Sequence, residues 1–80
     1  MFINKAKDGN NNISGKNIAK FRKELNISQR ELADRLQLTG LDIDKNAIQR
    51  IESGKRFVTD VELVYFSEVL DKTLNDLLFC

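Results

Sequence analysis

Four polar side chains in one short stretch of the chain could hydrogen-bond to the edges of DNA bases. Asn46 and Gln49 each carry a donor beside an acceptor, which matches the acceptor and donor that adenine presents in the major groove. Lys45 and Arg50 donate, which suits the acceptor edge of guanine. Every amphipathic helix has polar residues on its outer face, so residue type alone leaves base reading and ordinary solvent exposure both open.

These residues fall on a helix that the sequence predicts from Lys45 to Ser53. Asp44 before it is a good N-cap residue, and Gly54 after it is a common helix end. With about 100° between successive residues, Ile48 and Ile51 point inward, and the polar residues lie on the opposite and flanking faces. The first turn of such a helix normally enters the major groove.

A second helix is predicted just before it, beginning at Gln29. Ser28, followed three residues later by Glu31, is typical of a capping box, in which each side chain satisfies a free amide at the helix start. Three apolar residues then recur at one-turn spacing and predict a buried stripe: Leu32, Ala33 and Leu36. Gly40 is expected to end this helix in the left-handed conformation.

Three further helices complete the pattern. The first begins near Gly15, and its apolar stripe is Ile18, Phe21 and Leu25. Thr59 and Glu62 predict a second capping box at the start of a helix over residues 60–70, and Thr73 is expected to cap a short last helix. No strand-like alternation occurs, so we predict an all-α fold.

Composition narrows the function classes. The chain has 80 residues with no histidine, no proline and one cysteine, which is enough for one small domain. A histidine-based catalytic triad, a Cys and His zinc site and a disulfide within the chain are excluded. We expect no enzyme activity, no cofactor and no metal. No apolar run is long enough for a signal peptide or a membrane span, so a cytoplasmic protein is expected, with Cys80 a free thiol.

Charge is distributed unevenly along the chain. Residues 1–58 contain twelve Lys or Arg and seven Asp or Glu, whereas residues 59–80 contain one and five. A basic segment that includes the candidate reading helix, followed by an acidic one, fits a domain with a DNA side and a far side. Residues 1–14 show no helical periodicity and are expected to form a flexible tail before a domain of residues 15–80.

The order of these segments resembles the Cro and phage-repressor (Xre-like) type of helix-turn-helix protein. The resemblance spans about residues 18–78 and rests on three separated segments, FRKELNISQRELADRL, AIQRIESGKR and VELVYFSEVLDKTLNDLL. It implies a compact five-helix DNA-binding domain.

Roles follow from the resemblance position by position. Gln29 is expected to contact the DNA backbone and brace the recognition helix, and Lys55 and Arg56 to hold phosphate. Arg22 and Glu52 match a family pair that forms an internal salt bridge, so they are interpreted as structural. The base-facing positions match Lys45, Asn46 and Arg50, with Gln49 beside them.

The sequence departs from the family pattern before the recognition helix. Glu52 lies nineteen positions after Ala33, several more than is usual in the family, so residues 38–43 are predicted to form an enlarged turn. Asp42 and Asp44 also place negative charge near the presumed DNA face.

The function predicted from these observations is sequence-specific binding of double-stranded DNA by a small, repressor-like transcriptional regulator. The alternative is a helical protein-interaction module of the same fold. Four apolar residues do not belong to the predicted buried stripes. Because homodimers are common in the family, these residues are either a dimer contact or ordinary surface residues. They are Val61, Val64, Tyr65 and Phe79.

Overall fold

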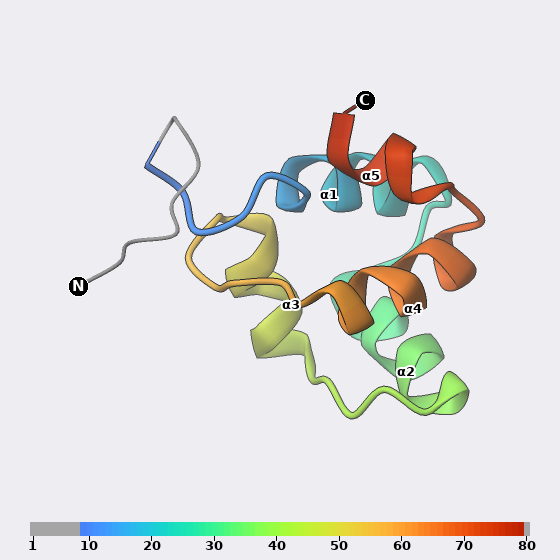
Figure 1. Ribbon diagram of the computed structural model, residues 1–80. Helices are drawn as coiled ribbons and strands as arrows, with labels where there is room; N and C mark the ends of the chain where they lie inside the picture. Colours follow the sequence, from blue (N-terminus) through green and yellow to red (C-terminus); the bar gives the residue numbers. More distant parts are fainter. Residues whose placement is uncertain (1–8, 80) are drawn as a thin grey trace.

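Five helices make up the part of the chain that the computed structural model describes, residues 9–79 (Figure 1). They are α1 (Gly15–Glu24), α2 (Gln29–Thr39), α3 (Lys45–Glu52), α4 (Asp60–Leu70) and α5 (Leu74–Phe79). No strand occurs between residues 9 and 79, which confirms the predicted all-α class. The predicted recognition helix ends one residue early, because Ser53 is its C-cap.

The start of α2 forms only half of the predicted capping box. The Ser28 hydroxyl accepts a hydrogen bond from the Glu31 amide at 3.0 Å. The Glu31 carboxylate accepts instead from Arg35, one turn later, at 2.8 Å. Gly40 ends the helix with φ at +113°, as predicted, because glycine adopts this left-handed conformation without steric cost.

The core contains buried residues from all five helices and two residues from the connections. Its buried residues are Ile18, Phe21, Ile27, Leu32, Ala33, Leu36, Ile43, Ile48, Ile51, Phe66, Leu70 and Leu77. Leu25 was predicted to belong to the buried stripe of α1, and this prediction was wrong. Leu25 is 43% exposed because it caps α1, after which Asn26 turns the chain with φ at +58°.

The connection between α2 and α3 is shorter than predicted. Leu38 belongs to α2, which continues to Thr39, so residues 40–44 form the enlarged turn. Ile43 is 3% exposed and anchors this turn in the core. The Gln37 side chain also donates to the Ile43 carbonyl at 2.8 Å. The enlarged turn, which is longer than the family pattern, is therefore packed against the domain.

The segment before α1 runs beside the loop that follows α3 (Figure 1). The Asn11 amide donates to the Gly54 carbonyl at 2.8 Å, and Ser14 is 2% exposed. The flexible tail predicted for residues 1–14 is therefore not what residues 10–14 form, because hydrogen bonds and burial hold them on the domain. Residues 1–8 and Cys80 lie outside the described residues.

One carboxylate joins the first three helices. Arg22 on α1 donates to both Glu52 oxygens, Nε at 2.7 Å and Nη2 at 3.0 Å, and Gln29 at the start of α2 donates to the same carboxylate at 3.0 Å. The remaining guanidinium nitrogen of Arg22 donates to the Ile27 carbonyl at 2.9 Å. The Arg22 and Glu52 side chains are only 11% and 8% exposed. The two charges are thus paired with each other and largely shielded from water.

We expect Glu52→Ala to lower the free energy of unfolding by about 3 to 5 kcal/mol, because it leaves the Arg22 guanidinium buried without its counter-charge. Urea unfolding measures the loss. Arg35→Ala is the control, since it breaks an exposed ion pair, 45% and 48% exposed, that contributes about 1 kcal/mol or less. Equal unfolding midpoints for Glu52→Ala and wild type would contradict this role.

Candidate nucleic-acid interface

The outward face of α3 carries the four residues predicted to read bases. Ile48 and Ile51 are completely buried on the inner face, which fixes the rotation of the helix. The four residues on the other side are all exposed: Lys45, Asn46, Gln49 and Arg50. Within residues 9–79 no side chain pairs with any of them. Their donors and acceptors are therefore available to a ligand.

The N-terminus of α3 is capped by a carboxylate. Asp44 accepts a hydrogen bond from the Ala47 amide at 2.8 Å. The negative side chain complements the positive end of the helix dipole, and it occupies the place where a phosphate would otherwise bind. A ligand reaching α3 is therefore expected to contact its side chains rather than its free amides.

A basic loop follows α3 at its other end. The chain turns at Gly54, whose φ is +79°, and the next two amides donate back to the Arg50 carbonyl, Lys55 at 2.8 Å and Arg56 at 3.3 Å. The Lys55 side chain is exposed. This geometry ties the position of the Lys55 backbone to the end of α3.

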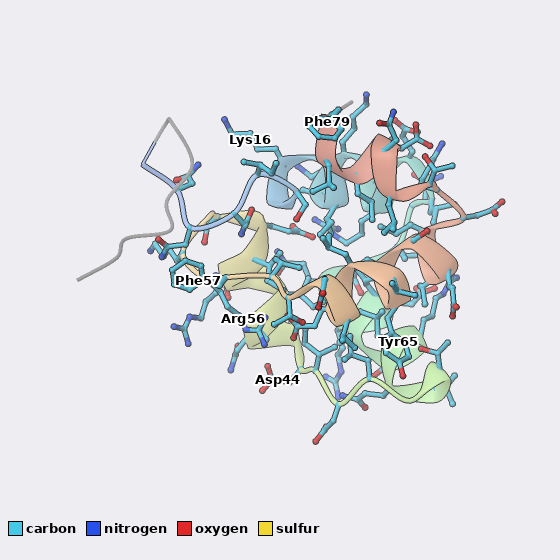
Figure 2. The ribbon with its side chains drawn as sticks, viewed as in Figure 1. Lys16, Asp44, Arg56, Phe57, Tyr65 and Phe79 are labelled. Carbon is cyan, nitrogen blue, oxygen red and sulfur yellow. The ribbon has the colours of Figure 1, made fainter. Side chains whose placement is uncertain are left out.

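Arg56 has a protein partner that the sequence analysis did not predict. Its guanidinium donates to both oxygens of Glu62 on α4, at 3.0 and 2.9 Å. Glu62 also accepts from the Thr59 amide, which completes the predicted capping box at the start of α4. The hydrogen bond to Glu62 raises the pKa of Arg56, and the negative charge of Asp44 acts in the same direction. Figure 2 shows Arg56 and Asp44 on the same side of the molecule.

This pair changes the expectation for Arg56 as a phosphate contact. Both outer nitrogens of the guanidinium already donate, and Nη1 also donates to the Phe57 carbonyl at 3.0 Å. Arg56 therefore fixes the loop to α4 in this structure, while Lys55 presents the accessible charge.

Gln29 is half-buried and points at Glu52 rather than outward. Its hydrogen bond to Glu52 braces α3, as the resemblance implied. Its contact with DNA phosphate stays a prediction.

A hollow of about 320 Å³ separates the outer faces of α2 and α3. Its lining residues come from both helices and the connection: Arg30, Ala33, Asp34, Gln37, Asp44, Lys45 and Asn46. Two of the predicted base-reading residues thus share a surface with Arg30, to which the sequence analysis assigned no role. The carboxylates of Asp34 and Asp44 make the charge of this surface mixed.

A sequence model of the helix-turn-helix family matches residues 18–77 of this chain. The chain belongs to the helix-turn-helix family. It is accordingly a DNA-binding regulator of transcription. No curated protein matches the sequence significantly.

The fold of this helix-turn-helix protein is also that of a solved structure, the restriction-modification controller protein C.AhdI from Aeromonas hydrophila. The two chains are 23% identical, and the match has a TM-score of 0.70 over 80% of this chain and 86% of the other. In the described part of this helix-turn-helix protein, no helix is long and apolar enough to cross a membrane. No cluster of three metal-ligating side chains occurs between residues 9 and 79.

Some of the contacts that were not predicted have a signal in the sequence of this helix-turn-helix protein, and others do not. Glu62 was identified only as a capping residue, although a carboxylate six residues after Arg56 is within reach when a short loop enters a helix. The contacts of Asn11 and Asn12 with the loop after α3 were missed because an asparagine run ahead of a helix is typical of an unstructured tail.

We expect Glu62→Gln to lower the free energy of unfolding at pH 7 by about 2 kcal/mol, because a charged hydrogen-bonding partner of Arg56 is lost. The hydrogen bond from Arg56 holds the pKa of Glu62 below its ordinary value. A lowered carboxyl pKa stabilises the folded state above the unfolded pKa, and this contribution disappears as the pH falls through the folded pKa.

Urea unfolding of Glu62→Gln and wild type between pH 7 and about pH 3 measures this difference. The gap between the two proteins should close toward the acidic end. Glu68→Gln, at an exposed position of the same helix, is the control and should match wild type throughout. A gap that does not vary with pH would show that the Glu62 charge does not stabilise the fold.

Proposed function

We propose that the protein binds double-stranded DNA in a sequence-specific manner, with α3 in the major groove, as a small repressor-like regulator. One observation carries the proposal: α3 is buried and braced on one side and presents four unpaired polar side chains on the other. These four are of the types that hydrogen-bond to base edges. Because the ligand is DNA, we expect the protein to act in the cytoplasm.

Base reading and phosphate binding are assigned to different residues. Four side chains read bases, namely Lys45, Asn46, Gln49 and Arg50. Lys55 binds phosphate through its exposed ammonium, and Gln29 adds a contact at the start of α2 while bracing Glu52. Arg56 supports phosphate binding mainly by holding the loop to α4. Arg30, at the edge of the hollow between α2 and α3, supplies a further positive charge toward the same side.

A second candidate is a protein-interaction module with the same fold. Asp34 and Asp44 line the hollow next to Lys45, which reduces the attraction of this face for phosphate. On α4, Val61 and Val64 are 60% and 47% exposed and could contact a protein, including a second copy of the chain. A homodimer would place two copies of α3 on an inverted repeat, with half-site centres roughly 34 Å apart.

Selection of bound duplexes from a random DNA pool, at low and near-physiological salt, separates the two functions. Sequence-specific binding predicts an enriched motif that persists as the salt concentration rises, and the symmetry of the motif reports whether one or two copies bind. Binding that vanishes with salt and enriches no motif would indicate phosphate attraction alone. The protein-interaction module would then be the better account.

We expect Arg50→Ala to cost about 1 to 3 kcal/mol in binding to the selected duplex and to relax specificity at one base position. Lys55→Ala should instead weaken selected and scrambled duplexes about equally and reduce the salt dependence of binding. Fluorescence anisotropy titrations of both variants on both duplexes measure these effects.

Lys72→Ala is a matched control, because it removes the same charge at a residue that lies over the Phe21 ring, 4.8 Å from its centroid. It should bind both duplexes almost as wild type does. If Arg50→Ala loses equal affinity for the selected and scrambled duplexes, its assignment to base reading is wrong.

A further inference from the structure

The side chain of Asn12 bridges three parts of the domain. Its amide nitrogen donates to the Ile51 carbonyl at 3.0 Å and to the Arg56 carbonyl at 2.8 Å. Its oxygen accepts from the Gly15 amide at 2.7 Å. The side-chain amide of Asn12 thus links the N-terminus of α1, the last turn of α3 and the basic loop. Both of its N–H groups and its oxygen are hydrogen-bonded.

Asn11 extends this bridge along the same loop. Its backbone amide donates to the Gly54 carbonyl at 2.8 Å, and its side chain donates to the Lys55 carbonyl at 2.9 Å. The last carbonyls of a helix lack partners within the helix. The two asparagines therefore cover the C-terminal end of α3 and the loop that continues from it.

Two glycines make room for this packing, Gly15 against the backbone of α3 and Gly54 against the Asn10 side chain. A Cβ atom at Gly15 would lie 2.1 Å from the Ile51 carbonyl oxygen, and one at Gly54 would lie 2.5 Å from the Asn10 Cγ. Both distances are far below van der Waals contact. The fit of residues 10–15 against the end of α3 thus depends on specific residues on both sides.

We propose that Asn11 and Asn12 form a clamp that positions the phosphate-binding loop for DNA. The loop backbone is held from two directions, because its amides donate to the Arg50 carbonyl while its carbonyls accept from the clamp. Without the clamp, the backbone that carries the exposed Lys55 side chain would be mobile. Phosphate binding would then have to order this backbone, which costs binding free energy. The asparagines act through Lys55 and are positioning residues.

The clamp rests on the proposed DNA binding, so its test needs a readout in free protein and a readout with DNA. Asn12→Ala removes all three hydrogen bonds. Asn12→Asp keeps the shape but sets a carboxylate oxygen against the carbonyls of Ile51 and Arg56. Asn17→Ala is the matched control, because Asn17 makes the same kind of bond, from its side chain to the Leu77 carbonyl at 2.8 Å, between α1 and α5.

In free protein, amide hydrogen exchange of Lys55 and Arg56 reports whether the loop is held. Exchange should accelerate at least tenfold in both Asn12 variants relative to Asn17→Ala. With a scrambled duplex, titrated over a range of salt at a temperature where circular dichroism shows every variant folded, the Asn12 variants should bind about tenfold more weakly. The salt dependence of their DNA binding should decrease by about the amount expected for the loss of one phosphate contact. Asn17→Ala should bind as wild type does.

Several results would overturn the clamp. One is that folded Asn12 variants show the same loop exchange rates and the same DNA affinity as wild type. Another is that Asn17→Ala loses as much DNA affinity as the Asn12 variants do. If Asn12→Ala does not fold, Asn11→Ala tests the same loop through the single side-chain bond to Lys55. A wild-type protein that binds no duplex would refute the proposed function. If exchange were still faster in the Asn12 variants, the two asparagines would stabilise the fold but would not position a loop for DNA.

Discussion

The buried carboxylate of Glu52 is the contact on which the arrangement of α1, α2 and α3 depends. Glu52 is the last residue of α3, and its carboxylate accepts hydrogen bonds from Arg22 and Gln29, so the end of α3 is fixed against both preceding helices. Breaking a buried pair leaves an uncompensated charge, which costs far more than losing a surface pair. The geometry of the candidate DNA face thus follows from one internal interaction that does not itself face DNA.

External support matters because α3 has only eight residues. Isolated helices of this length are not stable in water, so packing and capping must hold it. Ile48 and Ile51 bury its inner face, Asp44 caps its start, and Asn12 covers its end. Ile48 and Ile51 lie on the side of the helix opposite Asn46 and Arg50, whereas Asp44 lines the hollow between α2 and α3 together with Asn46. The position of α3 is therefore fixed while the polar side chains on its outer face stay exposed.

The five-helix fold and the exposed polar face of α3 could be predicted from the sequence, because both follow from local signals. Helical periodicity and N-cap residues located the helices, and the residues opposite Ile48 and Ile51 are indeed exposed. Contacts between segments far apart in the chain carried no such signal. The pairing of Arg22 with Glu52 came only from the family resemblance. The docking of Asn11 and Asn12 depends on how the chain folds back, which periodicity does not encode. The Arg56–Glu62 pair spans only six positions, but it too depends on the path of the loop into α4.

Nuclear magnetic resonance of the isotope-labelled protein, titrated with a selected duplex and with a scrambled duplex, tests the central claim most directly. The side-chain amide signals of Asn46 and Gln49 should shift with the selected duplex and barely move with the scrambled one, because only base contacts depend on sequence. The backbone amide of Lys55 should shift with both duplexes, as expected of a phosphate contact. Unchanged α3 signals with the selected duplex, or shifts confined to α4 and α5, would contradict the assignment of α3 as the reading helix.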